Sequence, residues 1–175
     1  MKEDESFVPL SSGATPDASI NSFFSFAGFK YGDTMADAHR ILGTPVDVDD
    51  DLENPFISQY YFPDQSDIEG FELSIDRDTN RIIGLNLQSK DAVYKIRSKG
   101  IADPNLSYLG QRWDIIKAKF GNPTVIDKPG NYGYEVHLSP EDRYAGLLIN
   151  FVCHEADDYI CSRIDILWFY ADRVI

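Results

Sequence analysis

The chain has 175 residues, and 43% of them are hydrophobic, which is enough to bury a core and excludes a disordered protein. Its formal net charge of −13 argues against nucleic acid and anionic membranes as partners, because phosphate groups require a basic surface. No apolar run approaches the length of a membrane span, and the acidic segment Met1–Ser6 lacks the basic and apolar regions of a signal peptide. We therefore expect a cytoplasmic protein, or a periplasmic or envelope protein from which a signal has been removed.

The first half of the chain predicts a tail, a helix and three strands. Residues 1–16 are polar and typical of a flexible tail, whereas the aromatic stretch 17–31 fits either a short helix with a loop or an edge strand. A helix is expected to begin after Thr34, whose spacing to Asp37 resembles a capping box, and to end at Gly43. Period-2 alternation then predicts a meander of strands over 57–62, 71–76 and 83–87.

The second half predicts the same order of elements. Segment 88–108 joins the halves and contains apolar residues that fit a short helix. Trp113, Ile116 and Phe120 then form one helical stripe that ends at Gly121. Strands are expected over 132–138, 147–153 and 160–169.

A spaced motif occurs once in each half. Gly32, Gly43 and Pro45 match Gly110, Gly121 and Pro123 at one constant offset of 78 residues. This repetition predicts a first α+β repeat over 17–90 and a second over 91–175, joined in one compact unit. The expected fold class is α+β, with two tandem helix-plus-three-stranded antiparallel meander repeats and helices on one face of a layered sheet.

This motif, two glycines and a proline on a short helix before a three-stranded meander, in tandem, resembles the β-lactamase-inhibitor-protein-like fold. Each single module is also similar to the small lipoproteins that assist outer-membrane assembly. The resemblance covers roughly residues 29–88 and 107–169. It implies a non-enzymatic protein that binds through an open sheet face, and it transfers no individual binding residue.

Strand alternation predicts which side chains lie on that open face. With Ile57, Tyr61 and Leu73 taken as core, the opposite parity exposes a set with both acidic and aromatic members. The candidate partner-binding residues are Tyr60, Phe62, Glu72, Glu135, His137, Arg163, Asp165 and Phe169. A shift of one residue would instead place Tyr60 and Phe62 in the core.

Patterns for metal binding and catalysis are weak. Asp47, Asp49 and Asp51 alternate as in a calcium loop, but the glycine and the final glutamate of that loop are missing, so a solvated acidic loop is the better interpretation. We find no nucleophile elbow, phosphate-binding glycine loop or metal-binding histidine pair around His39, His137 or His154. The sequence predicts no catalytic residue, metal site or cofactor.

Cys153 and Cys161 flank a predicted turn. A disulfide between them is one alternative, and two half-buried thiols on opposite faces of the strands is the one that side-chain alternation favours.

The expected function is a non-enzymatic protein-binding module, in its sharpest form an inhibitor or immunity-type protein that docks a basic toxin or enzyme. The alternatives are an exported envelope accessory protein of lipoprotein type, and a small-molecule binder or hydrolase with a site between the repeats. A homodimer formed through a sheet edge is a further expectation.

Overall fold

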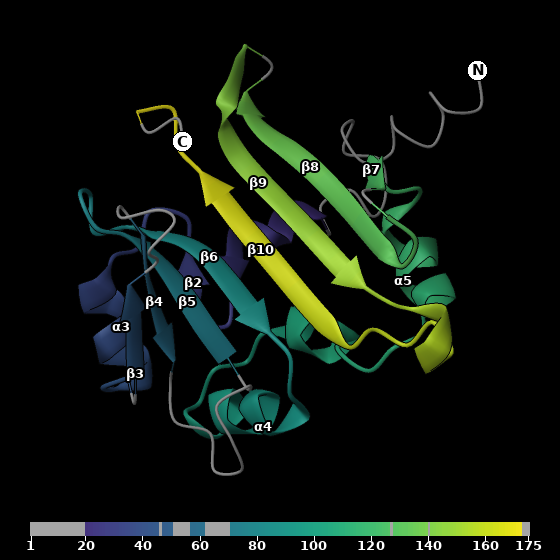
Figure 1. Cartoon of the computed structure of the whole chain (residues 1–175), viewed down its shortest axis with the longest axis horizontal. Coiled ribbons are helices and arrows are strands. Elements are labelled where there is room, and N and C mark those ends of the chain that lie inside the picture. Colours follow the sequence, from purple (N-terminus) through teal and green to yellow (C-terminus); the bar gives the residue numbers. More distant parts are fainter. Residues whose placement is uncertain are drawn as a thin grey trace.

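The computed structural model describes residues 20–45, 47–50, 57–61, 71–126, 128–139 and 141–172. Within these residues the fold is α+β, and eight strands form one antiparallel sheet in the order β3-β4-β5-β6-β10-β9-β8-β7 (Figure 1). The strands are β3 (Asp47–Asp50), β4 (Ile57–Tyr61), β5 (Phe71–Asp76), β6 (Ile82–Leu87), β7 (Val125–Ile126), β8 (Asn131–Ser139), β9 (Asp142–Val152) and β10 (Arg163–Phe169).

The described helices cover one face of this sheet, and none of them lies on the other face, here called the open face (Figure 1). The α-helices are α3 (Met35–Leu42), α4 (Lys90–Ser98) and α5 (Trp113–Phe120). The 3-10 turns are η1 (Ser22–Phe24), η2 (Pro104–Tyr108) and η3 (Glu155–Asp157), and β1 (Ser25–Phe26) pairs with β2 (Phe29–Lys30) as a separate ladder.

Local signals fix the ends of the helices. The Thr34 N–H donates to the Asp37 carboxylate at 2.9 Å, so the predicted capping residue does close the first turn of α3. Gly43 and Gly121 end α3 and α5 with φ angles of 86° and 84°, a region that glycine enters without steric cost. Ser89 caps α4, because its hydroxyl accepts the backbone N–H groups of Asp91 and Ala92.

The buried face of the sheet is made by one parity of each central strand. A continuous row of buried side chains crosses five strands, formed by Leu73, Leu85, Ile166, Ile149 and Tyr134. Aromatic side chains from the helix layer pack on it, and Phe23 of η1 lies 5.9 Å from Phe151 and 5.8 Å from Phe120, centroid to centroid. The core is therefore shared by the N-terminal segment, the helices and both halves of the sheet.

The sheet has two halves that meet where β6 pairs with β10. In each half a helix start is held by the last hairpin: the Met35 N–H donates to the Asn80 carbonyl at 3.0 Å, and the Trp113 N–H donates to the Tyr159 carbonyl at 2.8 Å. Beside each of these bonds lies an isolated bridge, Thr34 with Arg81 and Arg112 with Ile160.

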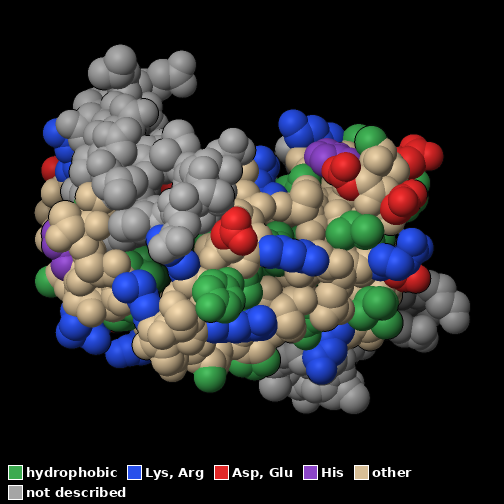
Figure 2. Space-filling view, turned by 90° about the horizontal axis from the view of Figure 1, so that it is seen from below, with side chains coloured by type: hydrophobic (Ala, Val, Ile, Leu, Met, Phe, Trp, Pro, Cys, Tyr) green, Lys and Arg blue, Asp and Glu red, His purple; other side chains and the backbone are tan. Residues whose placement is uncertain are grey.

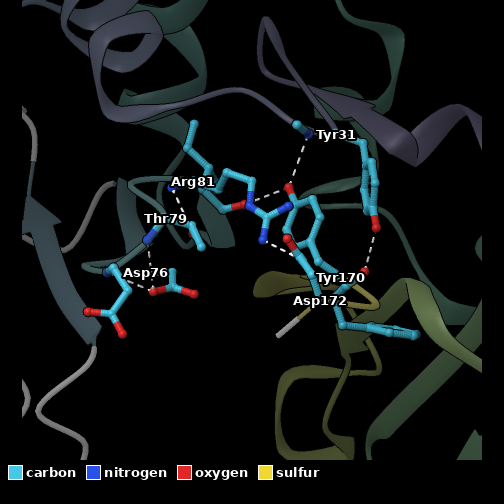
Figure 3. A network of polar contacts seen from close by, with 10 residues as sticks. Tyr31, Asp76, Thr79, Arg81, Tyr170 and Asp172 are labelled. Atoms are coloured by element: carbon cyan, nitrogen blue, oxygen red, sulfur yellow. Dashed lines mark hydrogen bonds and ion pairs between the residues drawn. The ribbon is translucent and has the colours of Figure 1, made fainter. Parts of the chain in front are cut away.

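Tyrosines tie the end of β10 to the turn before α3 (Figure 3). The Tyr170 hydroxyl accepts from the Gly32 N–H and donates to the Ile82 carbonyl, both at 3.0 Å. Its ring stacks on Tyr31 at 4.4 Å, and the Arg81 guanidinium lies 4.0 Å from the ring centroid. The Arg81 side chain also donates to Asp172 at 2.7 Å. The residues that follow β10 are therefore held both by the bonds of Tyr170 and by Arg81.

Several expectations need correction. Asp47–Asp50 is the edge strand β3 rather than a solvated loop, and β7 was not predicted, so each half of the sheet contributes four strands instead of three. Charged residues are common on edge strands because they discourage pairing with other chains, and here β4 supplies the pairing. Segment 17–31 was ambiguous: its described part forms η1 and the β1–β2 ladder. The predicted tail 1–16 lies outside the described residues.

The cysteines also differ from expectation. Cys153 and Cys161 are both fully buried rather than half-buried, and the Cys161 thiol donates to the Arg163 carbonyl at 3.4 Å. Strand alternation does not apply, because Cys153 follows the end of β9 and Cys161 precedes the start of β10.

Candidate functional site

The open face of the sheet carries three rows of paired residues. The polar row crosses β5, β6, β10, β9 and β8 and consists of Glu72, Asn86, Asp165, Asn150 and Gly133. The next row consists of Ser74, Gly84, Leu167, Leu148 and Glu135. A third, shorter row pairs Phe169 with Gly146 and Gly146 with His137.

The centre of the polar row holds two carboxylates that are partly removed from water. The Asn86 amide donates to the Asp165 carboxylate, and the Arg163 guanidinium donates to its other oxygen at 3.0 Å. Burial raises the pKa of Asp165, and the bonds from Arg163 and Asn86 offset only part of this effect. Burial, and then the Asp165 charge, raise the pKa of Glu72.

Beside the carboxylates the face becomes apolar. Leu167 is 44% exposed, and Leu148 and Phe169 are half-buried on the same face. The Phe169 ring meets the His137 ring edge to face, with centroids 6.1 Å apart. A partner that docks here therefore meets exposed apolar surface next to negative charge.

At two glycines of this face the neighbouring atoms leave no room for a side chain. A Cβ added at Gly146 would lie 2.1 Å from the Val136 carbonyl and 3.0 Å from the Phe169 ring. A Cβ at Gly84 would lie 3.2 Å from the Ser74 Cβ. The bare backbone at Gly146 lets Phe169 lie flat across the neighbouring strand instead of standing out from it.

Six of the eight predicted partner-binding residues share this face. They are Glu72, Glu135, His137, Arg163, Asp165 and Phe169. The register of β4 pairs Tyr60 with Leu73 and Tyr61 with Glu72. The segment from Ile57 to Phe62 has apolar residues at both parities, so alternation in its sequence does not decide which side chains face the core. Phe62 lies outside the described residues.

Three residues of the face were missed by the sequence argument. Asn86 lies directly between Glu72 and Asp165, and Leu148 and Leu167 form the apolar part. A signal existed in β10, because Arg163, Asp165 and Leu167 have one parity and Ile164 and Ile166 the other. The position of Asn86 on this face follows from the pairing of β6 with β10, and no local sequence pattern predicts that pairing.

Charge is distributed unevenly over the molecule. Segment 90–120, which contains α4 and α5, has seven of the 16 Lys and Arg residues but three of the 29 Asp and Glu residues. Figure 2, seen from the side on which α4 lies in Figure 1, shows basic side chains spread over this surface. The acidic open sheet and the basic helix surface are thus different parts of the molecule.

Other parts of the described structure offer little for chemistry. A hollow of about 450 Å³ is lined by Ser22, Ile101, Asp103 and Asn105 among others. Its polar groups already bond one another or the backbone: the Asn105 amide donates to the Ser22 hydroxyl at 2.8 Å, and Asp103 accepts the Ala27 N–H at 2.8 Å. Among the described residues, no three His, Cys, Asp or Glu side chains converge as metal ligands.

No described helix is both long and apolar enough to cross a bilayer. No family model and no curated protein matches the chain. One solved structure, a cysteine-rich secretory protein from Staphylococcus aureus, is similar with 11% sequence identity and a TM-score of 0.44, and the match covers 78% of this chain and 44% of that one. This chain therefore spans less than half the length of that protein.

Proposed function

We propose that this protein is a non-enzymatic protein-binding module whose open sheet face docks a basic patch of a protein partner. The observation that carries the proposal is the combination on one face of the partly buried carboxylates Glu72 and Asp165 with the exposed apolar side chain of Leu167. The sharpest form is an inhibitor or immunity-type protein that covers a basic toxin or enzyme.

The carboxylates support a binding role because they lower the stability of the free protein. A carboxylate that loses water without gaining a full set of donors is destabilised, which is why both pKa values are raised. Groups perturbed in this way are concentrated at functional sites. A basic partner would supply the missing donors and would also be steered toward the face by its charge.

The apolar part supplies the expected affinity. Leu167, Leu148 and Phe169 form a surface next to the charged row, and a protein interface typically has such an apolar centre with a polar rim. Aromatic and apolar anchors contribute most of the binding energy in interfaces, and exposed charges contribute mainly to the rate of association.

We further propose that the two halves are a tandem repeat. The constant sequence offset supports this, as do the matching contacts of Met35 with Asn80 and of Trp113 with Tyr159. A helix start held by the last hairpin, and a glycine of positive φ after each helix, occur in both halves. Two repeats joined edge to edge give one broad face, which suits a protein partner better than a small molecule.

Affinity capture with matched variants tests the proposal. The tagged protein is incubated with a lysate of its own host at low ionic strength and eluted with increasing salt. The sheet variant Glu72→Gln/Glu135→Gln/Asp165→Asn removes three charges from the open face, and the control Arg97→Gln/Lys99→Gln changes the last turn of α4 and the residue that follows it. We expect one stoichiometric partner that elutes with salt, is retained by the control and is lost from the sheet variant. Equal retention by both variants, or no retained protein, contradicts the proposal.

A further inference from the structure

The two cysteines close the base of the β9–β10 turn. Cys153 directly follows β9 and is 0% exposed, and Cys161 lies two residues before β10 and is 1% exposed. The register brings them together, because Arg163 pairs with Val152 and the Ser162 N–H donates to the Val152 carbonyl at 2.9 Å. The Cys161 thiol donates to the Arg163 carbonyl at 3.4 Å, and the neighbouring Cys153 thiol and burial both raise the pKa of Cys161.

The turn above this pair has an unfavourable backbone. Asp158 and Tyr159 have φ angles of 55° and 58°, so two consecutive residues with side chains adopt the left-handed conformation. Such residues persist only where surrounding contacts hold them. All residues from 154 to 160 are exposed, so the restraint comes from the base of the turn and from its backbone bonds.

Those backbone bonds connect the turn to the start of α5. The Trp113 N–H donates to the Tyr159 carbonyl at 2.8 Å, and the Cys161 N–H donates to the Gln111 carbonyl at 2.7 Å. The Gly110 N–H donates to the Cys161 carbonyl at 2.8 Å. Anything that fixes Cys161 in place therefore also fixes the N-terminal end of α5.

We propose that Cys153 and Cys161 are a dithiol that oxidises to an intrachain disulfide, a covalent clasp across the base of this turn. Two buried thiols at the ends of neighbouring, hydrogen-bonded antiparallel strands need little backbone movement to bond. The clasp goes beyond the proposed docking function and does not depend on it.

The oxidant is a small disulfide such as oxidised glutathione. One cysteine, as thiolate, attacks this disulfide, forms a mixed disulfide and releases one glutathione thiolate. The second cysteine thiolate then attacks the protein sulfur of that mixed disulfide, which forms the Cys153–Cys161 bond and releases the second glutathione thiolate. The two protons lost by the cysteines end on the two released thiols, so one disulfide is reduced for each one formed.

Access decides when this reaction takes place. The neighbouring thiol and burial hold the pKa of Cys161 above its ordinary range, and the folded, reduced pair is therefore slow to react. Exchange occurs when the exposed turn opens or while the chain folds. Once formed, the disulfide is shielded from reductants in the same way.

Refolding in a redox buffer tests the clasp. Reduced protein is unfolded in urea, refolded in a mixture of reduced and oxidised glutathione, treated with an alkylating reagent and weighed by mass spectrometry. We expect a monomer that is lighter than the reduced chain by two hydrogen atoms, with no alkylated or glutathione-bearing cysteine. The single variants Cys153→Ala and Cys161→Ala should each keep one thiol that is alkylated or carries glutathione.

A second readout is independent of the variants. In the oxidised protein, the amide protons of Trp113 and Cys161 should exchange with solvent more slowly than in the reduced protein, by about tenfold or more, because opening of the turn is restrained. A correctly folded wild-type protein, judged by circular dichroism, that keeps two alkylated thiols, carries two glutathiones or forms disulfide-linked dimers overturns the proposal. Unchanged exchange in a protein that has formed the bond overturns its role as a clasp.

Discussion

The hydroxyl group of Tyr170 should contribute measurably to the stability of the fold. Tyr170→Phe removes one oxygen atom that accepts from the Gly32 N–H and donates to the Ile82 carbonyl, both at 3.0 Å. The stack on Tyr31 and the contact with Arg81 remain, because both use the ring. Two lost hydrogen bonds at about 0.5–1.5 kcal/mol each predict a loss of about 2 kcal/mol in the free energy of unfolding.

Urea unfolding followed by circular dichroism measures this loss. The denaturant slope should stay constant while the midpoint falls, and about 2 kcal/mol corresponds to a decrease in Tm of about 4–8 °C for a chain of this size. Tyr94→Phe is the matched control, since Tyr94 is 74% exposed on α4, and it should change stability by less than about 0.5 kcal/mol. A Tyr170→Phe protein as stable as the control would show that the two hydrogen bonds of the hydroxyl do not stabilise the fold.

Three further substitutions give distinct results. Ser89→Ala removes the cap of α4 and should lower the urea-derived stability by about 1 kcal/mol, and no change would mean that the cap is replaced by water. Gly146→Ala forces a Cβ against the Val136 carbonyl and should cost about 3 kcal/mol in the same assay, whereas a neutral effect would contradict the close strand approach. Burial raises the pKa of Glu72 in the folded protein above its ordinary value of 4.5, so wild-type stability should fall as the pH rises from 4.5 through the raised pKa. Glu72→Gln should match wild type well below pH 4.5 and be the more stable protein at neutral pH, and identical pH profiles would contradict the burial of the charge.

Local sequence signals predicted the parts of the fold that local physics determines. The helix from Met35 to Leu42 follows from a capping residue at its start and a glycine at its end, which act within a few residues. The hairpin at Asp76 follows from the turn-forming residues after it, and the structure has the Asp76 carboxylate accepting the Asp78 N–H at 3.0 Å.

The missed features depend on partners that are distant in sequence. The edge strand Asp47–Asp50 consists mostly of residues that disfavour strands, and only its pairing with β4 makes it one. The position of Asn86 between Glu72 and Asp165 requires the pairing of β6 with β10, which are separated by the whole second half of the chain. The full burial of both cysteines likewise depends on the path of the turn between the strands.

Site-specific photo-crosslinking tests the docking face most directly. A photoreactive amino acid replaces either Leu167 on the open sheet or Tyr94 on α4, and the two proteins are irradiated in lysate of the native host and analysed by gel and mass spectrometry. We expect the Leu167 position to crosslink one partner in high yield, added salt to reduce this yield, and the Tyr94 position not to crosslink the same partner. Crosslinking of that partner from Tyr94 and not from Leu167 would contradict the assignment of the open sheet as the binding surface.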